Sequence, residues 1–305
     1  MRALFLYTFL MFPVALFAQE MAQAYYDNGQ LKSEGILEND QREGIWTIYH
    51  PNGEVRGKGN YTKNEPNGKW TFYYDNKEIE LLSDWKNGQR EGTFNYYYES
   101  GQILSEGKFV NDVQEGTWKY YHEHGTIGKE GRFEQGFKSG LWTTYFGHGQ
   151  VKTSENYSKG QLSGPCTVYY SNGTKQSSRF FRTIAVAVED VEVNKDLEDA
   201  SVLWIIEGVD VEEGQKDKTW KTYNANGALA SVQNYENGQK EGLWLSYYET
   251  GKRKASTTYV KGIQTGAVVY YYPSSKVKEE GYLSNGLKDK EWKTYYENGS
   301  LLSKE

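Results

Sequence analysis

The sequence predicts an all-β protein, an elongated open antiparallel sheet built from tandem β-hairpin repeats of about 24 residues each. Three observations predict this fold. A tyrosine recurs with a step of 24 residues, further aromatic columns keep the same step, and X-Gly pairs separate the aromatic runs. Aromatic residues favour strands, glycine supplies the positive φ of tight turns, and no apolar period of 3.6 residues indicates helices.

The N-terminal segment is typical of a secretory signal. Arg2 precedes an apolar run from Ala3 to Phe17, and Ala18 offers a small residue for cleavage. The run is too short to anchor the chain stably in a bilayer. We therefore predict a removable signal peptide over residues 1–18 and an exported protein that is periplasmic, outer-membrane-associated or secreted.

The tyrosine and tryptophan residues of two recurrent columns are the predicted binding residues. The tyrosine column consists of Tyr49, Tyr73, Tyr97, Tyr121, Tyr145, Tyr169, Tyr223, Tyr247, Tyr271 and Tyr295. Three residues before these lies the tryptophan column, Trp46, Trp70, Trp118, Trp142, Trp220, Trp244 and Trp292, with Phe94, Cys166 and Val268 in the remaining units. Twelve residues after each tyrosine comes a third column: Tyr61, Trp85, Phe109, Phe133, Tyr157, Phe181, Tyr235 and Tyr259.

The strand period decides which side of the sheet each column occupies. Successive side chains on a strand point to opposite faces, so Trp118 and Tyr120 should share one face and Tyr121 the other. A fixed 24-residue step brings equivalent residues into register on neighbouring hairpins. Contacts between stacked aromatic residues of neighbouring units are then expected to stabilise the fold, because one unit alone buries too little surface.

Two turn signals divide every unit. Pairs such as Asn52-Gly53 and His124-Gly125 mark the first turn, and pairs such as Asn87-Gly88 mark the second. Repeats of this kind are predicted over residues 21–181 and 207–305. The strands at the two ends of such an open sheet have a free edge, which allows pairing with another copy of the chain.

The repeat frame is broken once. From Gly164 to Lys218 the spacing is 54 residues, which is two units plus six. Residues 182–206 are therefore interpreted as a degenerate repeat with an acidic loop. A decayed repeat that keeps the sheet continuous is the simpler interpretation, and a hinge or partner-specific element is the alternative.

No set of side chains predicts catalysis or metal binding. His124 and His148 occupy turn positions that other units fill with Asn or Ser, so a zinc site is not expected. Cys166 stands in the tryptophan column as a small buried hydrophobic residue. The Glu residues recur with the period of the repeat, such as Glu115 and Glu241, whereas a catalytic pair occurs once in a chain. We therefore predict that the protein is not an enzyme and uses no cofactor.

The net charge restricts the partners. Removal of Arg2 with the signal leaves 34 basic against 41 acidic residues. Nucleic acids and anionic membrane surfaces select positive patches, so nucleic acid is excluded and membrane-surface association is not favoured. A protein partner is expected.

Residues 115–121 (Glu-Gly-Thr-Trp-Lys-Tyr-Tyr) and 241–248 (Glu-Gly-Leu-Trp-Leu-Ser-Tyr-Tyr) resemble the MORN repeat. The match is closer to its bacterial variant, seen in YwqK-type antitoxin components, and covers about 25–181 and 207–305. The resemblance implies an elongated open antiparallel sheet of successive hairpins. It also implies roles in scaffolding, protein interaction and, for some members, membrane association.

Three functional hypotheses follow from the repeat surface. In the first, the protein is a non-enzymatic scaffold or protein-interaction protein of the cell envelope or secreted fraction. In the second, it is an antitoxin or immunity-type protein that sequesters a toxin. In the third, exposed Trp and Tyr side chains stack on the sugar rings of glycans.

Overall fold

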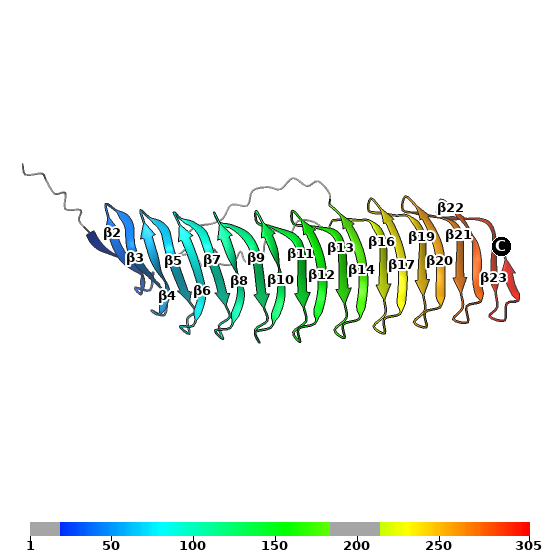
Figure 1. Ribbon diagram of the computed structural model, residues 1–305, viewed down its shortest axis with the longest axis horizontal. Helices are drawn as coiled ribbons and strands as arrows, with labels where there is room; N and C mark the ends of the chain where they lie inside the picture. The colour runs from blue at the N-terminus through cyan, green and yellow to red at the C-terminus, as the bar shows by residue number, and fades with distance from the viewer. Residues whose placement is uncertain (1–18, 184–213) are drawn as a thin grey trace, which may run out of the picture.

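A computed structural model describes residues 19–183 and 214–305. The predicted signal peptide lies outside the described residues, as does the predicted degenerate repeat beyond residue 183. Within the described residues every regular element is a β-strand, and Figure 1 shows the hairpins following one another in a single row along the long axis. The predicted all-β sheet of tandem hairpins is confirmed. No helix in the described part of the chain has the length and apolar character to cross a membrane.

The strands of the first half are β1 (Gln19–Tyr25), β2 (Leu31–Glu38), β3 (Gln41–Tyr49), β4 (Val55–Thr62), β5 (Glu65–Tyr73), β6 (Ile79–Lys86), β7 (Gln89–Tyr97), β8 (Ile103–Val110), β9 (Val113–Tyr121), β10 (Ile127–Glu134), β11 (Phe137–Tyr145), β12 (Val151–Ser158), β13 (Gln161–Tyr169) and β14 (Lys175–Arg182). The second half contains β15 (Gln215–Lys216), β16 (Lys218–Tyr223), β17 (Leu229–Glu236), β18 (Gln239–Lys240), β19 (Gly242–Tyr247), β20 (Arg253–Val260), β21 (Ile263–Tyr271), β22 (Val277–Ser284), β23 (Leu287–Tyr295) and β24 (Leu301–Lys304). Strands that follow one another in sequence pair antiparallel, except that β15 and β16 both pair with β14, and β18 and β19 both pair with β17.

The two turns of a unit differ in geometry, as β7 to β9 illustrate. After β7, the backbone N–H of Tyr98 donates to Gln102 O and that of Gly101 donates to Tyr98 O, both at 2.8 Å. After β8, Asn111 and Asp112 form a two-residue turn with φ of 50° and 66°. Two successive positive φ values characterise the hairpin turn whose twist matches that of the strands.

A glycine near the middle of most of the long strands makes a bulge. Between the paired residues of β8 and β9, Lys108↔Glu115 and Glu106↔Lys119, β9 contains extra residues. Gly116 lies in this bulge with φ of 72°. The bulge places Trp118 over the middle of β8, and the glycine column of the repeat supplies the backbone angle that this requires.

In two units a lysine replaces the glycine at the bulge position. Lys218 and Lys290 have φ values of 56° and 60°. A side chain in this left-handed region costs roughly 1–2 kcal/mol. These two positions are therefore strained members of an otherwise glycine column.

Replacing Lys290 with glycine should stabilise the protein. Relief of the left-handed backbone outweighs both the added flexibility of glycine in the unfolded chain and the loss of the Lys290 ammonium from the Tyr282 ring, 4.2 Å away. We expect a gain of about 0.5–1 kcal/mol in urea unfolding. Lys288→Gly is the control, because Lys288 is a strand residue of ordinary φ, and its replacement should destabilise. Equal effects of the two changes would contradict the assignment of strain.

The sheet is continuous across the break in the repeat frame. β14 pairs with β15 through Phe181↔Lys216 and with β16 through Ser178↔Lys221. The Trp220 Nε1–H donates to Phe180 O, 40 residues earlier, whereas the equivalent bond spans 10 residues in other units. The chain therefore returns after residues 184–213 to the position that the next strand of a regular repeat would occupy.

Candidate functional site

The sheet has two different faces, named here by their main columns. The Trp face carries the tryptophan column and the aromatic column twelve residues after each tyrosine. The Tyr face carries the tyrosine column. In β9, Trp118 is fully buried on one face while Tyr121 is half-buried on the other, as alternation of side chains predicts.

On the Trp face, the two aromatic columns interlock into one ladder. Trp118 lies between Phe109 and Phe133, with ring centroids 5.3 and 6.0 Å away and planes nearly perpendicular. Edge-to-face and tilted pairs continue the ladder from Trp46 to Trp70 and from Phe181 to Tyr259. This geometry favours aromatic pairs by roughly 0.5–1.5 kcal/mol beyond area burial, and it connects each hairpin to the next.

Beneath most of the tryptophans lies a glycine that belongs to the preceding strand. A Cβ added to Gly107 would fall 2.2 Å from the Trp118 ring, and comparable contacts of 2.1–2.5 Å arise at Gly35, Gly59, Gly131 and Gly281. Each of these rings also donates from its Nε1–H to the backbone carbonyl ten residues earlier, at 3.0–3.2 Å. The glycine of each Glu-Gly pair is therefore a flat platform on which the indole lies.

This platform explains differences between units that the sequence analysis left unexplained. Where the column residue is Ser83, Glu155 or Thr257, the residue eleven positions later is not tryptophan but Phe94, Cys166 or Val268. Tryptophans over glycine are at most 7% exposed. Trp220 and Trp244, which face Arg179 and Gln233 instead, are only half-buried. The sequence signal that could have revealed this contact is the correlation between the glycine column and the residue eleven positions later.

The burial of the tryptophan column bears on its predicted role in binding. Trp46, Trp70, Trp118, Trp142 and Trp292 are packed inside the Trp face, so a ligand reaches little of their ring surface. Trp220 and Trp244 keep part of their rings accessible. Cys166, predicted as a buried hydrophobic residue, is 2% exposed.

The tyrosine column is the accessible one, since all ten predicted members are half-buried on the Tyr face. Four of them donate from their hydroxyl to the Glu of the Glu-Gly pair at 2.6–2.8 Å: Tyr49 to Glu34, Tyr121 to Glu106, Tyr145 to Glu130 and Tyr295 to Glu280. The Glu-Gly pair thus serves both faces, because its carboxylate holds a tyrosine while its glycine supports a tryptophan.

These bonds change the acidity of the tyrosines. The hydrogen bond to Glu34, followed by burial, raises the pKa of Tyr49 to about 12. Burial, followed by the hydrogen bond to Glu106, raises the pKa of Tyr121 to about 12. The hydrogen bonds from Tyr49 and then Gln23 lower the pKa of Glu34.

The Tyr49–Glu34 pair should therefore stabilise the fold over a defined pH window. Its contribution is complete between the ordinary pKa of Glu, 4.5, and that of Tyr, 10.0, and is lost as pH rises toward about 12 or falls through the lowered pKa of Glu34. Tyrosine ring-carbon NMR should show Tyr49 titrating near pH 12. In Glu34→Gln its pKa should return toward 10, with Tyr121 unchanged as internal control. An unmoved Tyr49 would contradict the pairing.

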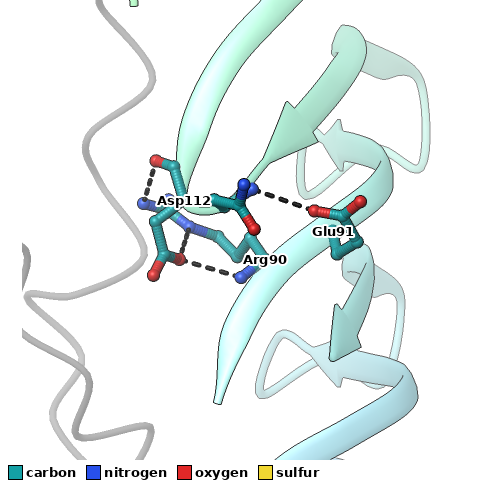
Figure 2. A network of polar contacts seen from close by, with 4 residues as sticks. Arg90, Glu91 and Asp112 are labelled. Carbon is teal, nitrogen blue, oxygen red and sulfur yellow. Dashed lines mark hydrogen bonds and ion pairs between the residues drawn. The ribbon is translucent and has the colours of Figure 1, made fainter. Parts of the chain in front are cut away.

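The other recurrent glutamates have a structural role. Glu43, Glu91, Glu115 and Glu241 each accept a hydrogen bond at 2.7–2.9 Å from the first backbone N–H of the second turn of the next unit. Figure 2 shows this contact from Asn111 to Glu91. These carboxylates fix the turns, which agrees with the interpretation of a periodic Glu as structural.

The histidines also hold the backbone. His124 Nε2 lies 2.7 Å from Gly147 O, and His148 Nε2 lies 3.0 Å from Ser171 O, each in the next unit. His50 and His122 stand where Tyr98 and Tyr248 use a hydroxyl to reach the same carbonyl position. Across residues 19–183 and 214–305, no three His, Cys, Asp or Glu side chains gather as metal ligands.

One ion pair of the described sheet is almost fully buried. Arg90 Nε lies 3.2 Å from Asp112 Oδ1, and the side chains are 7% and 9% exposed. The backbone N–H of Arg90 also donates to Asp112 Oδ1 at 2.8 Å, and the side-chain Nη2 of Arg90 donates to the backbone carbonyl of Asp112 at 3.3 Å (Figure 2). The guanidinium carbon lies 4.1 Å from the Phe109 ring centroid. Burial lowers the pKa of Arg90, and the Asp112 carboxylate opposes this shift.

Together these features define a class of protein: a tandem β-hairpin repeat whose units are held to each other by an aromatic ladder, with a polar tyrosine stripe on the opposite face. The chain belongs to the family described as the MORN repeat variant. The sequence profile of this family matches residues 22–39, 42–63, 66–87, 90–111, 114–135, 216–237, 240–261, 264–285 and 288–305. Between 136 and 215 the profile has no match, although β11 to β14 continue the same pairing.

Other comparisons are less informative. No curated protein matches the chain. The crystal structures of TcdB2-TccC3-Cdc42, TcdB2-TccC3 and TcdB2-TccC3-TEV align with 11–12% identity and TM-scores of 0.18–0.19. These alignments cover 91–94% of this chain but only 15–18% of those chains. Scores this low carry no argument about fold or function.

Proposed function

We propose that the protein is a non-enzymatic scaffold of the cell envelope or secreted fraction that binds a protein partner through its Tyr face. The supporting observation is that the tyrosine column stays half-buried and in register along the whole described sheet, whereas most of the tryptophan column is packed away. A partner that spans several units meets the same surface repeatedly. Interfaces are enriched in tyrosine, which supplies contact area at low entropic cost.

Exposed apolar side chains on the same face support this proposal. Ile45, Leu141 and Leu243 are 62%, 55% and 48% exposed, and alternation places them beside the tyrosine column. These apolar side chains are exposed to water at equivalent positions of the repeat, so burying them against a partner would favour binding. The periodic Glu and His side chains of the described residues hold the sheet, which supports the non-enzymatic part of the proposal.

The test is photo-cross-linking in envelope extracts with the full mature chain. A cross-linking amino acid at Leu141 or Leu243 on the Tyr face should trap one and the same protein. The matched control positions are Lys240 and Lys288, which are accessible on the Trp face and should trap none. Trapping from the lysine positions alone, or from neither face, would refute the proposal.

The outcome also separates the alternatives that the sequence left open. A trapped protein that is toxic when expressed alone, and harmless with this chain, would assign the antitoxin role. A trapped second copy of this chain would assign self-association. Within the described residues, β1 and β24 each have a partner strand on one side only, through β2 and β23, so end-to-end pairing is the expected mode.

A further inference from the structure

The Trp face is hollow at the junction of β14, β16 and β17. A cleft of about 480 Å³ opens there, lined among others by Arg179, Lys216, Trp220, Gln233 and Tyr235. This volume lies within the roughly 300–1,000 Å³ typical of small-molecule sites. At Trp118 and Phe133 on the same face, in contrast, the aromatic ladder is closely packed.

The cleft results from the loss of the glycine platform. Arg179 occupies the column position that is glycine beneath five other tryptophans, and Gln233 follows in the next unit. Trp220 therefore cannot lie flat on the sheet as Trp118 does over Gly107, and it stays half-buried. Its orientation is nevertheless fixed, because its Nε1–H donates to Phe180 O at 3.0 Å. The result is an indole ring that is held in place and accessible from the cleft.

The cleft is positively charged in a chain of net charge −6. The side chains of Arg179 and Lys216 line it, and among the described residues no Asp or Glu does. The Arg179 guanidinium carbon lies 5.7 Å and Lys216 Nζ 5.0 Å from the Trp220 ring centroid. Within the described residues neither side chain forms an ion pair, and Arg179 Nε donates to Ser177 Oγ at 3.0 Å. Two cations thus flank one accessible aromatic ring.

We infer that this cleft binds an acidic saccharide of the hexuronic-acid class. The accessible part of the Trp220 ring stacks on the apolar face of a sugar ring, beside the Tyr235 ring, which is tilted by 51° to it. Arg179 and Lys216 bind the carboxylate of the sugar by charge-assisted hydrogen bonds. The side chains of Thr222 and Gln233 supply polar groups for the sugar hydroxyls. A peptide strand is disfavoured, because β14 and β16 are paired on both sides and offer no free edge.

Isothermal titration calorimetry with trigalacturonate tests the inference on the full mature chain. The fully methyl-esterified trisaccharide is the matched probe, because it keeps the rings and removes the charge. We expect the acid to bind at least about tenfold more tightly than the ester, with affinity falling as salt is added. Absence of binding, or equal affinity for acid and ester, would overturn the inference.

Arg179→Gly separates binding from folding. The change restores the glycine platform, so Trp220 should settle onto the sheet, and the unfolding midpoint should stay constant or rise. Binding of trigalacturonate should nevertheless weaken at least about tenfold, and Lys216→Gln should weaken it similarly. Lys288→Gln removes an equivalent cation, 4.6 Å from the packed Trp292 ring, and should have no effect. Undiminished binding by Arg179→Gly would refute the site. The inference is independent of the proposed protein partner on the Tyr face.

Discussion

Replacement of Gly107 by serine should destabilise the protein by about 3 kcal/mol. The new Cβ would fall 2.2 Å from the Trp118 ring, which is fully buried and hydrogen-bonded through its Nε1–H to Lys108 O. The indole must therefore leave its site or the strands must move apart. Urea unfolding followed by tryptophan fluorescence measures the loss.

The chain itself provides the compensating change. In a neighbouring unit Ser83 occupies the glycine position and Phe94 the tryptophan position, and both are buried. The double variant Gly107→Ser, Trp118→Phe should therefore be more stable than Gly107→Ser alone by at least about 1 kcal/mol. Simple addition of the two single costs would refute the platform. Gly147→Ser is the control, because an added Cβ there meets only the edge of the His124 ring, at 3.3 Å, and should cost little.

The fold was predictable because its cause is repeated. A step of 24 residues, recurring turn glycines and alternation within each strand determine the hairpins and their faces, and they place Trp118 and Tyr121 on opposite sides. The bulge, in contrast, was not predicted. Gly116 recurs in its column, but the sequence does not show that its positive φ moves the tryptophan over the preceding strand.

The sequence also did not predict which columns contact one another. The tryptophan and tyrosine columns form separate stripes, as expected, but the sequence does not show that the tryptophans interlock with the column of Phe109 and Phe133. The register across two strands decides this contact, and the register depends on the bulge. Neither the Arg90–Asp112 pair nor Arg179 of the cleft recurs with the 24-residue step, so no periodic signal indicates them. Features that break the repeat therefore required the structure, as did the bulge and the contacts that depend on it.

Arg90→Ala should cost about 3–5 kcal/mol, the largest effect expected of any single substitution outside the aromatic ladder. The change removes the cation that faces the buried Asp112 carboxylate, together with the contact of the guanidinium with the Phe109 ring. Urea unfolding should show the loss at neutral pH. Arg132→Ala is the matched control, because the Arg132–Glu134 pair is more than half exposed and is expected to contribute less than about 1 kcal/mol.

Replacing both charged residues with uncharged ones should recover most of the lost stability. The single change is costly because it leaves one buried charge unpaired, and not because it alters the shape of the site. The next unit carries Gln114 and Gly136 in place of Arg90 and Asp112, and its turn has the same form, with φ of 81° at Gly136. The double variant Arg90→Gln, Asp112→Gly should therefore lie within about 1–2 kcal/mol of the parent chain. A double variant as unstable as Arg90→Ala would mean that the ion pair itself stabilises the sheet. Recovery would instead mean that burying either charge alone is what destabilises it, and that the repeat tolerates either a complete pair or none.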